Sequence, residues 1–342
     1  MKTALLHYWL TNWRGGEKVL AALAEMFPTA DIYTHAYRPE RVPQFSKRRV
    51  KESFIAHLPT ARHHPQRFLP LMPRATAAFD LSDYDLIISS ESGPIKGIRK
   101  PAAARHICYC HTPMRYLWDL HDDYYRSAGW GGKLAMRLFT RYLRAADLKS
   151  ADSVDQFIAN SQCVAERIRR LYGRDATVVY PPVAVDFYAA RPLDRAPLDK
   201  PYYLFVGAPV PYKRLDLARA ACARLGRDLR VVSGGVTSDE ELRDLYAQAT
   251  ALLFPGLEDF GIVPVEAMAA GCPVIAYGAG GALETVVEGE TGLFFREPTI
   301  DSLIAAMEEF ESRPWNREAC RVRARLFSRD RFNAALRRIV KI

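Results

Sequence analysis

The sequence lacks the features that mark several common classes of protein. Its six cysteines show neither a paired CxxC spacing nor a Cys/His pattern typical of zinc, which argues against a disulfide framework and a metal site. No apolar run reaches the roughly 18 residues of a membrane span, and the apolar run at the N-terminus is too short for a signal peptide. The GxGxxG spacing of dinucleotide-binding proteins is also absent. We therefore expect a chain suited to a reducing cytoplasm, with no membrane-spanning segment, metal or nicotinamide cofactor.

Length and charge indicate the number of domains and the class of partner. The chain has 342 residues, about twice a common domain size, and its 49% hydrophobic content can fill two cores. A formal net charge of +9 indicates an acidic partner, and nucleic acid, anionic lipid and phosphorylated substrates all fit that charge. Nucleic acid is disfavoured because no known binding motif accompanies the basic residues.

Short apolar runs alternate with helical patterns along the whole chain. In the first half, strands are expected at residues 3–8, 84–89, 106–110, 156–160 and 177–180. A second series is expected at residues 202–207, 229–232, 252–254, 273–277 and 292–295. This alternation predicts parallel sheets with crossover helices, and open sheets of this kind bind ligands at the carboxyl ends of their strands.

The predicted fold is therefore α/β, with two Rossmann-like domains facing a central cleft. Pro181 and Pro182 end the first series stiffly, and further prolines follow them. We place the first domain at residues 1–183 and the second at residues 184–326. The last helix, within residues 327–342, is expected to pack back on the first domain.

Residues 257–268 place two carboxylates around a loop that opens a helix. Pro264 suits the first helical turn, so the helix is expected from about Val263. Gly261 permits a sharp turn, which leaves the N–H groups of residues 261–265 free to hold an anion. Glu258 lies in the loop, and Glu266 near the third helical position either satisfies the helix dipole or reaches sugar hydroxyls. The pattern indicates a phosphate and sugar site, with a well-capped helix as the plainer alternative.

Three other segments follow predicted strands and carry candidate residues. Gly15 and Gly16 form a strand-to-helix turn, which is a weak signal because such turns use glycine for packing anyway. His111 ends the strand at 106–110, with Thr112 as the expected N-cap and Pro113 as the first residue of a helix. On these residues alone a hydrogen-bonded structural histidine is favoured, and His7, His64 and His106 are left as structural or surface residues.

Lys213 and Arg214 follow the strand at 202–207 and a Pro-Tyr turn. Cations at this position can neutralise two phosphates without a metal. Solvated surface charge is the alternative.

Together these segments carry a family resemblance. Glu258 and Glu266 resemble the paired glutamates of retaining, two-domain (GT-B) glycosyltransferases of the mannosyltransferase-like family four. Five more segments are similar to that family in the expected order: Arg14–Leu20, Cys108–Asp119, Tyr180–Val183, Pro211–Arg214 and Gly280–Val286. The likeness runs nearly end to end, and within the family it is strongest to bacterial enzymes that build polysaccharide on lipid carriers.

The resemblance implies a hexosyltransferase with a nucleotide-sugar donor, GDP-mannose being the best candidate, and a lipid-linked or polysaccharide acceptor. It implies catalytic roles for three residues: Glu258 at the donor sugar, His111 as a contact to that sugar, and Lys213 at the donor diphosphate. It implies substrate binding by Gly15, Gly16, Arg214, Phe260, Gly261, Ile262, Val263 and Glu266. No metal or other cofactor is implied.

Two departures from the family pattern keep other functions open. Ala208 stands where the family usually has an arginine, and a helix and strand normally found between residues 232 and 239 are missing. We therefore expect the second sheet to lack an edge strand and the nucleotide-base pocket to be altered. A catalytically impaired GT-B subunit of a glycan-assembly complex and a GT-B sugar-nucleotide epimerase are the alternative functions.

A basic amphipathic helix is expected near the middle of the first domain. Lys133, Arg137, Arg141 and Arg144 recur at helical spacing beside an apolar stripe of Leu134, Leu138, Phe139, Tyr142 and Leu143. Such a helix either packs on its own domain with a solvated basic face or docks on an anionic membrane. The second alternative predicts a peripheral location on the inner face of the cell membrane.

Overall fold

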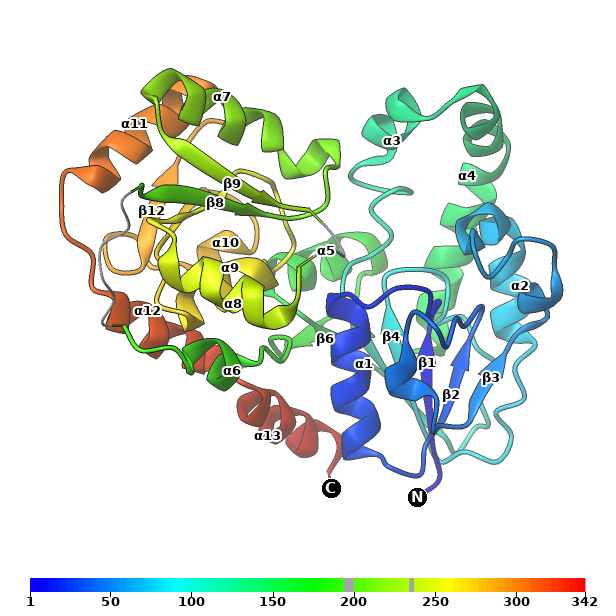
Figure 1. The fold of residues 1–342 in the computed structure, drawn as a ribbon. Coiled ribbons are helices and arrows are strands. Elements are labelled where there is room, and N and C mark those ends of the chain that lie inside the picture. The colour runs from blue at the N-terminus through cyan, green and yellow to red at the C-terminus, as the bar shows by residue number, and fades with distance from the viewer. Residues whose placement is uncertain (194–199, 234–236, 342) are drawn as a thin grey trace. The chain divides into compact units, whose positions relative to one another are not determined.

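The computed structural model describes residues 1–193, 200–233 and 237–341, and the chain forms two compact units, Met1–Val179 and Tyr180–Ile342. Each unit is built on one parallel sheet with helices packed on it, as the alternating pattern predicted (Figure 1). Every strand expected from an apolar run is present.

The N-terminal unit contains seven strands in the order β3-β2-β1-β4-β5-β6-β7. Their bounds are β1 Thr3–His7, β2 Asp31–Thr34, β3 Val50–Glu52, β4 Leu86–Glu91, β5 Arg105–Cys110, β6 Gln156–Ala159 and β7 Ala176–Val178. The strand order reverses between β1 and β4, which pair in parallel from Thr3 with Leu86 to His7 with Ser90. Open α/β sheets bind their ligands at such a switch point, beyond the strand ends.

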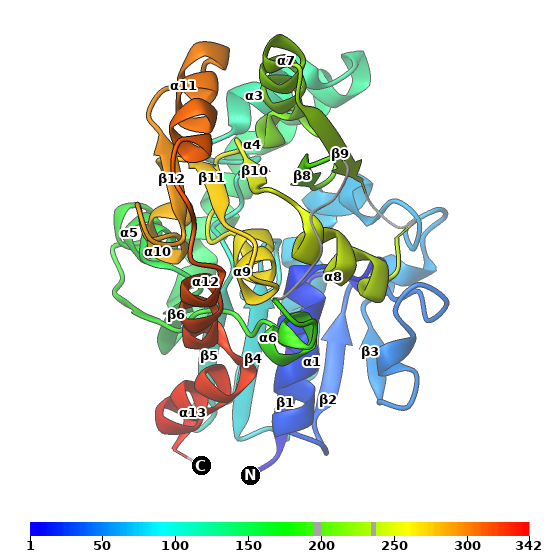
Figure 2. The same ribbon diagram turned by 60° about the vertical axis from the view of Figure 1, so that its left-hand side comes forward.

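Helices and turns connect these strands. The α-helices are α1 Gly15–Met26, α2 Met72–Ala77, α3 His121–Ser127, α4 Trp130–Ser150 and α5 Gln162–Tyr172. The short 3-10 helices are η1 Pro43–Phe45, η2 Phe54–His57, η3 Pro65–Leu71 and η4 Ala151–Ser153. Figures 1 and 2 both show α1 running alongside β1.

The helix predicted to begin at Pro113 is absent. Residues 112–120 form turns, and the next helix, α3, begins only at His121. The Thr112 hydroxyl, expected to cap that helix, instead accepts a hydrogen bond from the Arg167 guanidinium at 2.6 Å. Burial of Met114 and Leu117 in a small cluster holds the segment in this path.

The C-terminal unit contains five strands in the order β12-β11-β10-β8-β9, with the order reversing between β8 and β10. The strands are β8 Tyr202–Val206, β9 Asp228–Val232, β10 Leu252–Phe254, β11 Val274–Tyr277 and β12 Gly292–Phe295. Among the described residues no strand lies between β9 and α8, so β9 is an edge strand, in line with the predicted loss of the family's outer strand.

Helices cover both faces of this sheet (Figure 2). Their bounds are α6 Val185–Ala189, η5 Pro211–Lys213, α7 Leu215–Leu225, α8 Asp239–Gln248, α9 Ile262–Ala269, α10 Ala282–Thr285, α11 Ile300–Glu311, α12 Arg317–Ala324, η6 Arg325–Phe327 and α13 Arg329–Val340. Side chains of α7 and α11 form the core on one face, and those of α6, α8, α9 and α12 form the core on the other. The packing of α13 on the first domain stays a prediction.

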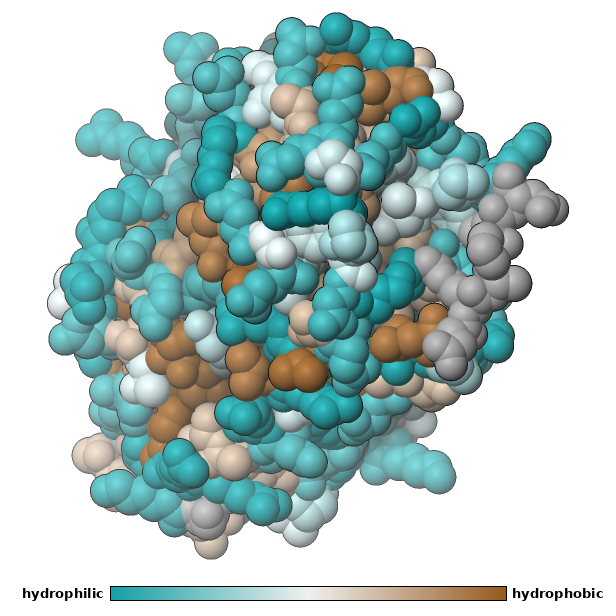
Figure 3. Space-filling model, turned by 90° about the vertical axis from the view of Figure 1, so that its left-hand side faces the viewer, coloured by the Kyte–Doolittle hydropathy of each residue, from teal (hydrophilic) through white to brown (hydrophobic). Residues whose placement is uncertain are grey.

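The apolar stripe of α4 is mostly exposed. Of the five predicted stripe residues only Leu143 is buried, while Leu138 is 63% exposed and the nearby Trp130 is 83% exposed. The molecular face in Figure 3, by contrast, is largely hydrophilic with small separated apolar patches. In the described part of the chain, no helix combines the length and hydropathy needed to cross a bilayer.

Candidate active site

One group of candidate residues lies at the switch point of the C-terminal sheet. Lys213 ends η5 directly after β8, and Glu258 lies in the loop after β10, so the pairing of β8 with β10 brings the two together. The Lys213 ammonium group donates a hydrogen bond to Glu258 Oε1 and forms an ion pair with it. Both side chains are largely buried, 16% and 18% exposed, so solvent screens this pair less than a surface pair.

Glycines hold the Glu258 loop in this position. A Cβ atom on Gly256 would come within 2.8 Å of the Lys213 Cα atom, and one on Gly281 would come within 2.2 Å of the Phe260 Cα atom. Gly281 also donates its N–H to the Glu258 carbonyl at 2.9 Å. A side chain at either glycine would push the loop away, which explains the Gly280–Gly281 segment and a role for Gly256 that sequence reasoning missed.

Gly261 is the N-cap of α9 and has φ +88°, a left-handed conformation that glycine adopts readily. The helix begins at Ile262, one residue earlier than predicted, so Pro264 is its third residue and Glu266 its fifth. No side chain caps the helix, which leaves the N–H groups around Ile262 and Val263 suited to an anion.

Glu266 and Phe260 are both buried in the C-terminal unit. Glu266 is 5% exposed and accepts a hydrogen bond from the Tyr246 hydroxyl at 3.3 Å. Phe260 is 3% exposed and packs on Tyr180 and Phe327. The side chain of Phe260 therefore belongs to the core, and its predicted substrate contact is restricted to the backbone; the ribose role of Glu266 stays a prediction.

Arg214 has φ +53° and is the N-cap of α7. Its guanidinium donates to the Asp216 carboxylate at 3.2 Å and to the Pro298 carbonyl at 3.5 Å. Its positive charge is thus partly matched within the unit, so Arg214 is a poor replacement for the arginine that the family usually has at position 208.

A second, separate group of candidate residues lies at the switch point of the N-terminal sheet. Gly15 and Gly16 are the first residues of α1 itself, so the predicted turn is the first turn of the helix. A Cβ atom on Gly16 would lie 3.3 Å from the Tyr8 hydroxyl, 3.4 Å from His7 Cε1 and 3.7 Å from His111 Nε2. The tight contact is with Tyr8, whereas a Cβ atom would meet both histidines at ordinary van der Waals distance.

His111 and His7 are linked through one serine. Ser90 Oγ, at the end of β4, lies 2.8 Å from His111 Nε2 and 3.1 Å from His7 Nδ1. Burial, with a smaller contribution from the neighbouring His7 in the same direction, lowers the pKa of His111 to about 3, so its ring is neutral at ordinary pH. The interpretation of His7 as merely structural missed this link; its position at a strand end beside the switch point was the available signal.

The structure thus gathers the predicted residues in two groups. Lys213, Glu258 and the start of α9 lie together in the C-terminal unit, and Gly16 and His111 lie together in the N-terminal unit. Among the described residues no cluster of three or more His, Cys, Asp or Glu side chains is suited to a metal ion.

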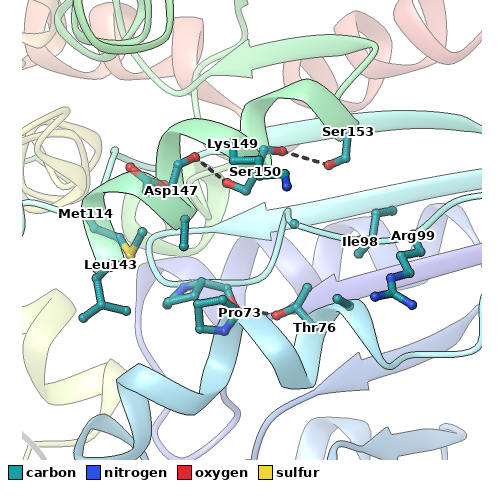
Figure 4. Close-up of a pocket in the computed structure, with 14 residues that line it drawn as sticks. Pro73, Thr76, Ile98, Arg99, Met114, Leu143, Asp147, Lys149, Ser150 and Ser153 are labelled. Atoms are coloured by element: carbon teal, nitrogen blue, oxygen red, sulfur yellow. Dashed lines mark hydrogen bonds between the residues drawn. The ribbon is translucent and has the colours of Figure 1, made fainter. Parts of the chain in front are cut away.

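A cavity of about 300 Å³ lies elsewhere in the N-terminal unit, between α2, residues 94–99 and α4 (Figure 4). Its polar lining includes Asp147, whose carboxylate accepts hydrogen bonds from Lys96 and from the Trp118 indole. None of the predicted site residues lines this cavity.

Comparison with known families places the chain. Residues 13–187 match the family model described as Glycosyltransferase Family 4, and residues 229–327 match that of glycosyl transferases group 1. The chain belongs to glycosyltransferase family 4. The resemblance drawn from the sequence motifs is thereby confirmed.

Individual family members are similar over part of their length. The D-inositol 3-phosphate glycosyltransferase of Mycolicibacterium smegmatis is 28% identical over 180 residues, which cover 41% of this chain and 42% of that protein. The alpha-1,3/1,6-mannosyltransferase ALG2 of Dictyostelium discoideum is 34% identical over 109 residues, which cover 32% of this chain and 26% of that protein. Each alignment thus spans less than half of the relative.

Solved structures match along the whole chain. Sucrose-phosphate synthase from Thermosynechococcus elongatus has a TM-score of 0.71 at 18% identity, covering 100% of this chain and 98% of that one. Anabaena HepE in complex with UDP has a TM-score of 0.69 at 16% identity, with both chains fully covered. These likenesses agree with the GT-B fold predicted for this glycosyltransferase.

Proposed function

We propose that this glycosyltransferase moves a hexose, with retention of configuration, from a nucleotide sugar to a lipid-linked or polysaccharide acceptor. The observation that carries the proposal is the Lys213–Glu258 ion pair beside the uncapped start of α9, at a sheet switch point. GDP-mannose is the proposed donor, supported by the mannosyltransferase relative ALG2. The structure of HepE in complex with UDP-glucose supports a nucleotide-sugar donor more broadly.

Charge explains how these groups act. When a glycosyl–phosphate bond breaks, the leaving diphosphate gains negative charge, and groups placed in advance to hold it lower the barrier. Lys213 and the N–H groups at Gly261, Ile262 and Val263 supply that stabilisation. Glu258, which holds the Lys213 ammonium group, orients the donor sugar and stabilises positive character at its reacting carbon.

Retention follows most simply from attack on the same face as the leaving group. The acceptor oxygen forms a bond to the reacting sugar carbon while the bond between that carbon and the diphosphate oxygen breaks. The departing diphosphate takes the proton from the acceptor hydroxyl. No separate base is needed in this scheme, with a Glu258 nucleophile as the alternative. His111 contacts the donor sugar and Glu266 holds the ribose hydroxyls.

The exposed face of α4 supports a proposal about location. Leu134, Leu138 and Tyr142 are exposed on this helix together with Arg137 and Arg141, a combination suited to the surface of an anionic membrane. The guanidinium of Arg144 is less available to this surface, because it donates a hydrogen bond to the Leu117 carbonyl at 2.7 Å. A lipid-linked acceptor fits this surface better than a soluble one.

Vesicle sedimentation tests the membrane proposal. Binding to vesicles that contain anionic lipid should fall strongly when Arg137→Glu and Arg141→Glu are combined. The combination of Arg219→Glu and Arg331→Glu changes the net charge equally on exposed residues of other helices and should leave binding near the wild-type level. Equal loss in both double variants would point to net charge rather than to α4.

Release of nucleoside diphosphate tests the reaction. The chain is incubated with GDP-, UDP- and ADP-sugars, with and without a polyprenyl-diphosphate glycan. Acceptor-dependent release from one donor, lost in Glu258→Ala and Lys213→Ala, is the expected result. Arg227→Ala is the matched control, because it breaks another ion pair of the same unit, that with Glu311.

Two other outcomes would favour the alternative functions. No binding or release with any donor would favour a catalytically impaired assembly subunit, for which Ala208 and the missing outer strand are the supporting observations. Conversion of the sugar nucleotide itself without an acceptor would favour an epimerase.

A further inference from the structure

Four side chains, three of them buried, form a line of polar contacts from α1 to His111. Glu17 Oε1 lies 3.7 Å from His7 Nε2, and Ser90 Oγ lies 3.1 Å from His7 Nδ1 and 2.8 Å from His111 Nε2. Glu17 is 2% exposed, and His7 and Ser90 are completely buried. Water therefore does not compete for these three groups, and each must find its hydrogen-bond partner among its protein neighbours.

The Ser90 hydroxyl gives the two histidines opposite roles. A hydroxyl has one proton, so Ser90 donates to one ring nitrogen and accepts from the other. If it donates to His7 Nδ1, then His111 carries its proton on Nε2 and has a bare Nδ1. If it donates to His111 Nε2, then His111 carries its proton on Nδ1 and His7 Nε2 is bare.

Glu17 distinguishes these two arrangements. His7 Nε2 is buried and has no hydrogen-bond partner, and the Glu17 carboxylate is at ion-pair distance from it. A bare Nε2 would set a lone pair against a carboxylate, whereas a protonated Nε2 points a positive hydrogen at it. The arrangement in which Ser90 donates to His7 Nδ1, so that His7 Nε2 carries the proton, is therefore favoured strongly at a site of low dielectric constant.

We infer that Glu17, acting through His7 and Ser90, fixes His111 with a proton on Nε2 and a bare Nδ1 that accepts a hydrogen bond from a donor-sugar hydroxyl. The ligand in this inference rests on the proposed function. Glu17, His7 and Ser90 are positioning residues, since His111 alone touches the sugar. Nδ1 of His111 makes no hydrogen bond within the described part of the chain, and the ring is half-buried, so this atom is available.

The surroundings keep this arrangement in place. Glu17 Oε2 accepts the Arg14 N–H at 3.0 Å, which fixes the carboxylate on the first turn of α1. Gly16 lies beside both rings, since a Cβ atom there would be 3.4 Å from His7 Cε1 and 3.7 Å from His111 Nε2. The low pKa of His111, about 3, keeps a single proton on the ring, and a neutral ring has one acceptor.

Nuclear magnetic resonance of the full chain with ¹⁵N-labelled histidine tests the placement of the proton without substrate. Long-range ¹H–¹⁵N correlation spectra distinguish a protonated ring nitrogen from a bare one, and the loss of a signal in His111→Gln assigns it. We expect His111 in the wild type to be protonated on Nε2. A proton on Nδ1 would overturn the inference, and this measurement requires no substitution of Glu17, His7 or Ser90.

Glu17→Gln tests the cause. The glutamine amide can donate to His7 Nε2, which reverses the line of hydrogen bonds, so the single tautomer of the wild type should be lost at His111. Glu25→Gln removes an exposed carboxylate from the same helix and should change nothing. An unchanged His111 tautomer in a folded Glu17→Gln protein would overturn the inference.

Kinetics test the consequence. In the transferase assay, Glu17→Gln and Ser90→Ala should each lower kcat/KM about tenfold, the size expected for one hydrogen bond in the transition state, while Ser89→Ala should not. A shifted tautomer with unchanged kcat/KM would contradict the positioning role. If the wild type transfers no sugar, the proposed function fails, and the resonance spectra still decide whether Glu17 sets the tautomer.

Discussion

Two histidines, one on β5 and one directly after it, meet consecutive serines of β4 yet differ in what they can do. Ser89 Oγ lies 2.8 Å from His106 Nε2, and Ser90 Oγ lies 2.8 Å from His111 Nε2. Burial lowers the pKa of His106 to about 4 and that of His111 to about 3. The second nitrogen of His106 donates to the Ser153 carbonyl at 2.9 Å, whereas Nδ1 of His111 has no such partner among the described residues.

The difference lies in the uncommitted atom rather than in burial or pKa. Both rings are kept neutral and held by a serine, but His106 has used both nitrogens inside the fold. Because successive residues of a strand point to opposite faces, Ser89 and Ser90 serve different faces of the sheet. His111 also follows the strand end at the switch-point edge of the sheet, where ligands bind. A histidine with one free nitrogen at that edge is the functional candidate.

The largest expected effect is on stability, from His106→Ala. The change leaves Ser89 Oγ and the Ser153 carbonyl without their buried partner and opens a cavity, which together should cost about 3–4 kcal/mol of unfolding free energy. Denaturant unfolding measures this loss. His63→Ala, at an exposed histidine, is the control and should change stability by less than about 0.5 kcal/mol.

His111→Ala should show the converse pattern. We expect kcat/KM to fall by about 10²-fold, the size expected when a substrate is misplaced, with a smaller loss of stability than in His106→Ala. Steady-state kinetics and denaturant unfolding of the same preparations measure both. Equal losses of stability and of activity in the two variants would contradict the distinction between a structural His106 and a functional His111.

The free energy of unfolding should depend on pH differently in the wild type and in a His106 variant. The pKa of His106 falls from its ordinary 6.5 to about 4 in the folded protein, mainly through burial, with Lys100 and Lys96 acting in the same direction. The hydrogen bond to the Ser153 carbonyl and the charge of Asp155 oppose this shift. The unfolded chain therefore binds more protons between these values, so stability is present above about pH 6.5 and is lost as pH falls toward 4. In His106→Gln, the stability difference between pH 7 and pH 5 should shrink by about 2 kcal/mol.

The buried carboxyl of Glu91 gives stability the opposite dependence on pH, and it is present in both the wild type and His106→Gln. Burial raises the pKa of Glu91 to about 7, so its contribution to stability is lost as pH rises through that value. It cancels when the two unfolding curves are subtracted. An unchanged pH dependence in His106→Gln would mean that His106 is not held neutral by burial.

The comparison also shows what the sequence could reveal. Long apolar runs predicted most of the strands, because parallel strands buried on both faces must be apolar. Of the two strands that were missed, β2 has a polar residue at each end, and β3 is only half-buried. Residues 112–120 were predicted wrongly because the contact of Thr112 with Arg167 is distant in sequence and competes with local capping.

Within the candidate site, local chemistry was visible and distant contacts were not. Glu258, Gly261 and Lys213 were found from strand ends, a turn glycine and charge. The ion pair between Lys213 and Glu258 depends on the pairing of β8 with β10, which no local pattern encodes. His7 was missed for the same reason, since only the neighbouring positions of β1 and β4 bring it to Ser90.

The smallest effects, from the two serines, sharpen the comparison most. Ser89→Ala removes a buried hydroxyl from His106, and Ser90→Ala removes one from both His111 and His7, so each should cost about 1–2 kcal/mol of stability. Matched losses would make the pair a controlled experiment, because any difference in kcat/KM between them then reflects the histidine rather than the fold. Lower activity in Ser90→Ala alone is expected, since only its histidine keeps a nitrogen for substrate. Equal loss of activity in both would mean that the rigidity of β4, and not the tautomer of His111, is what the reaction requires.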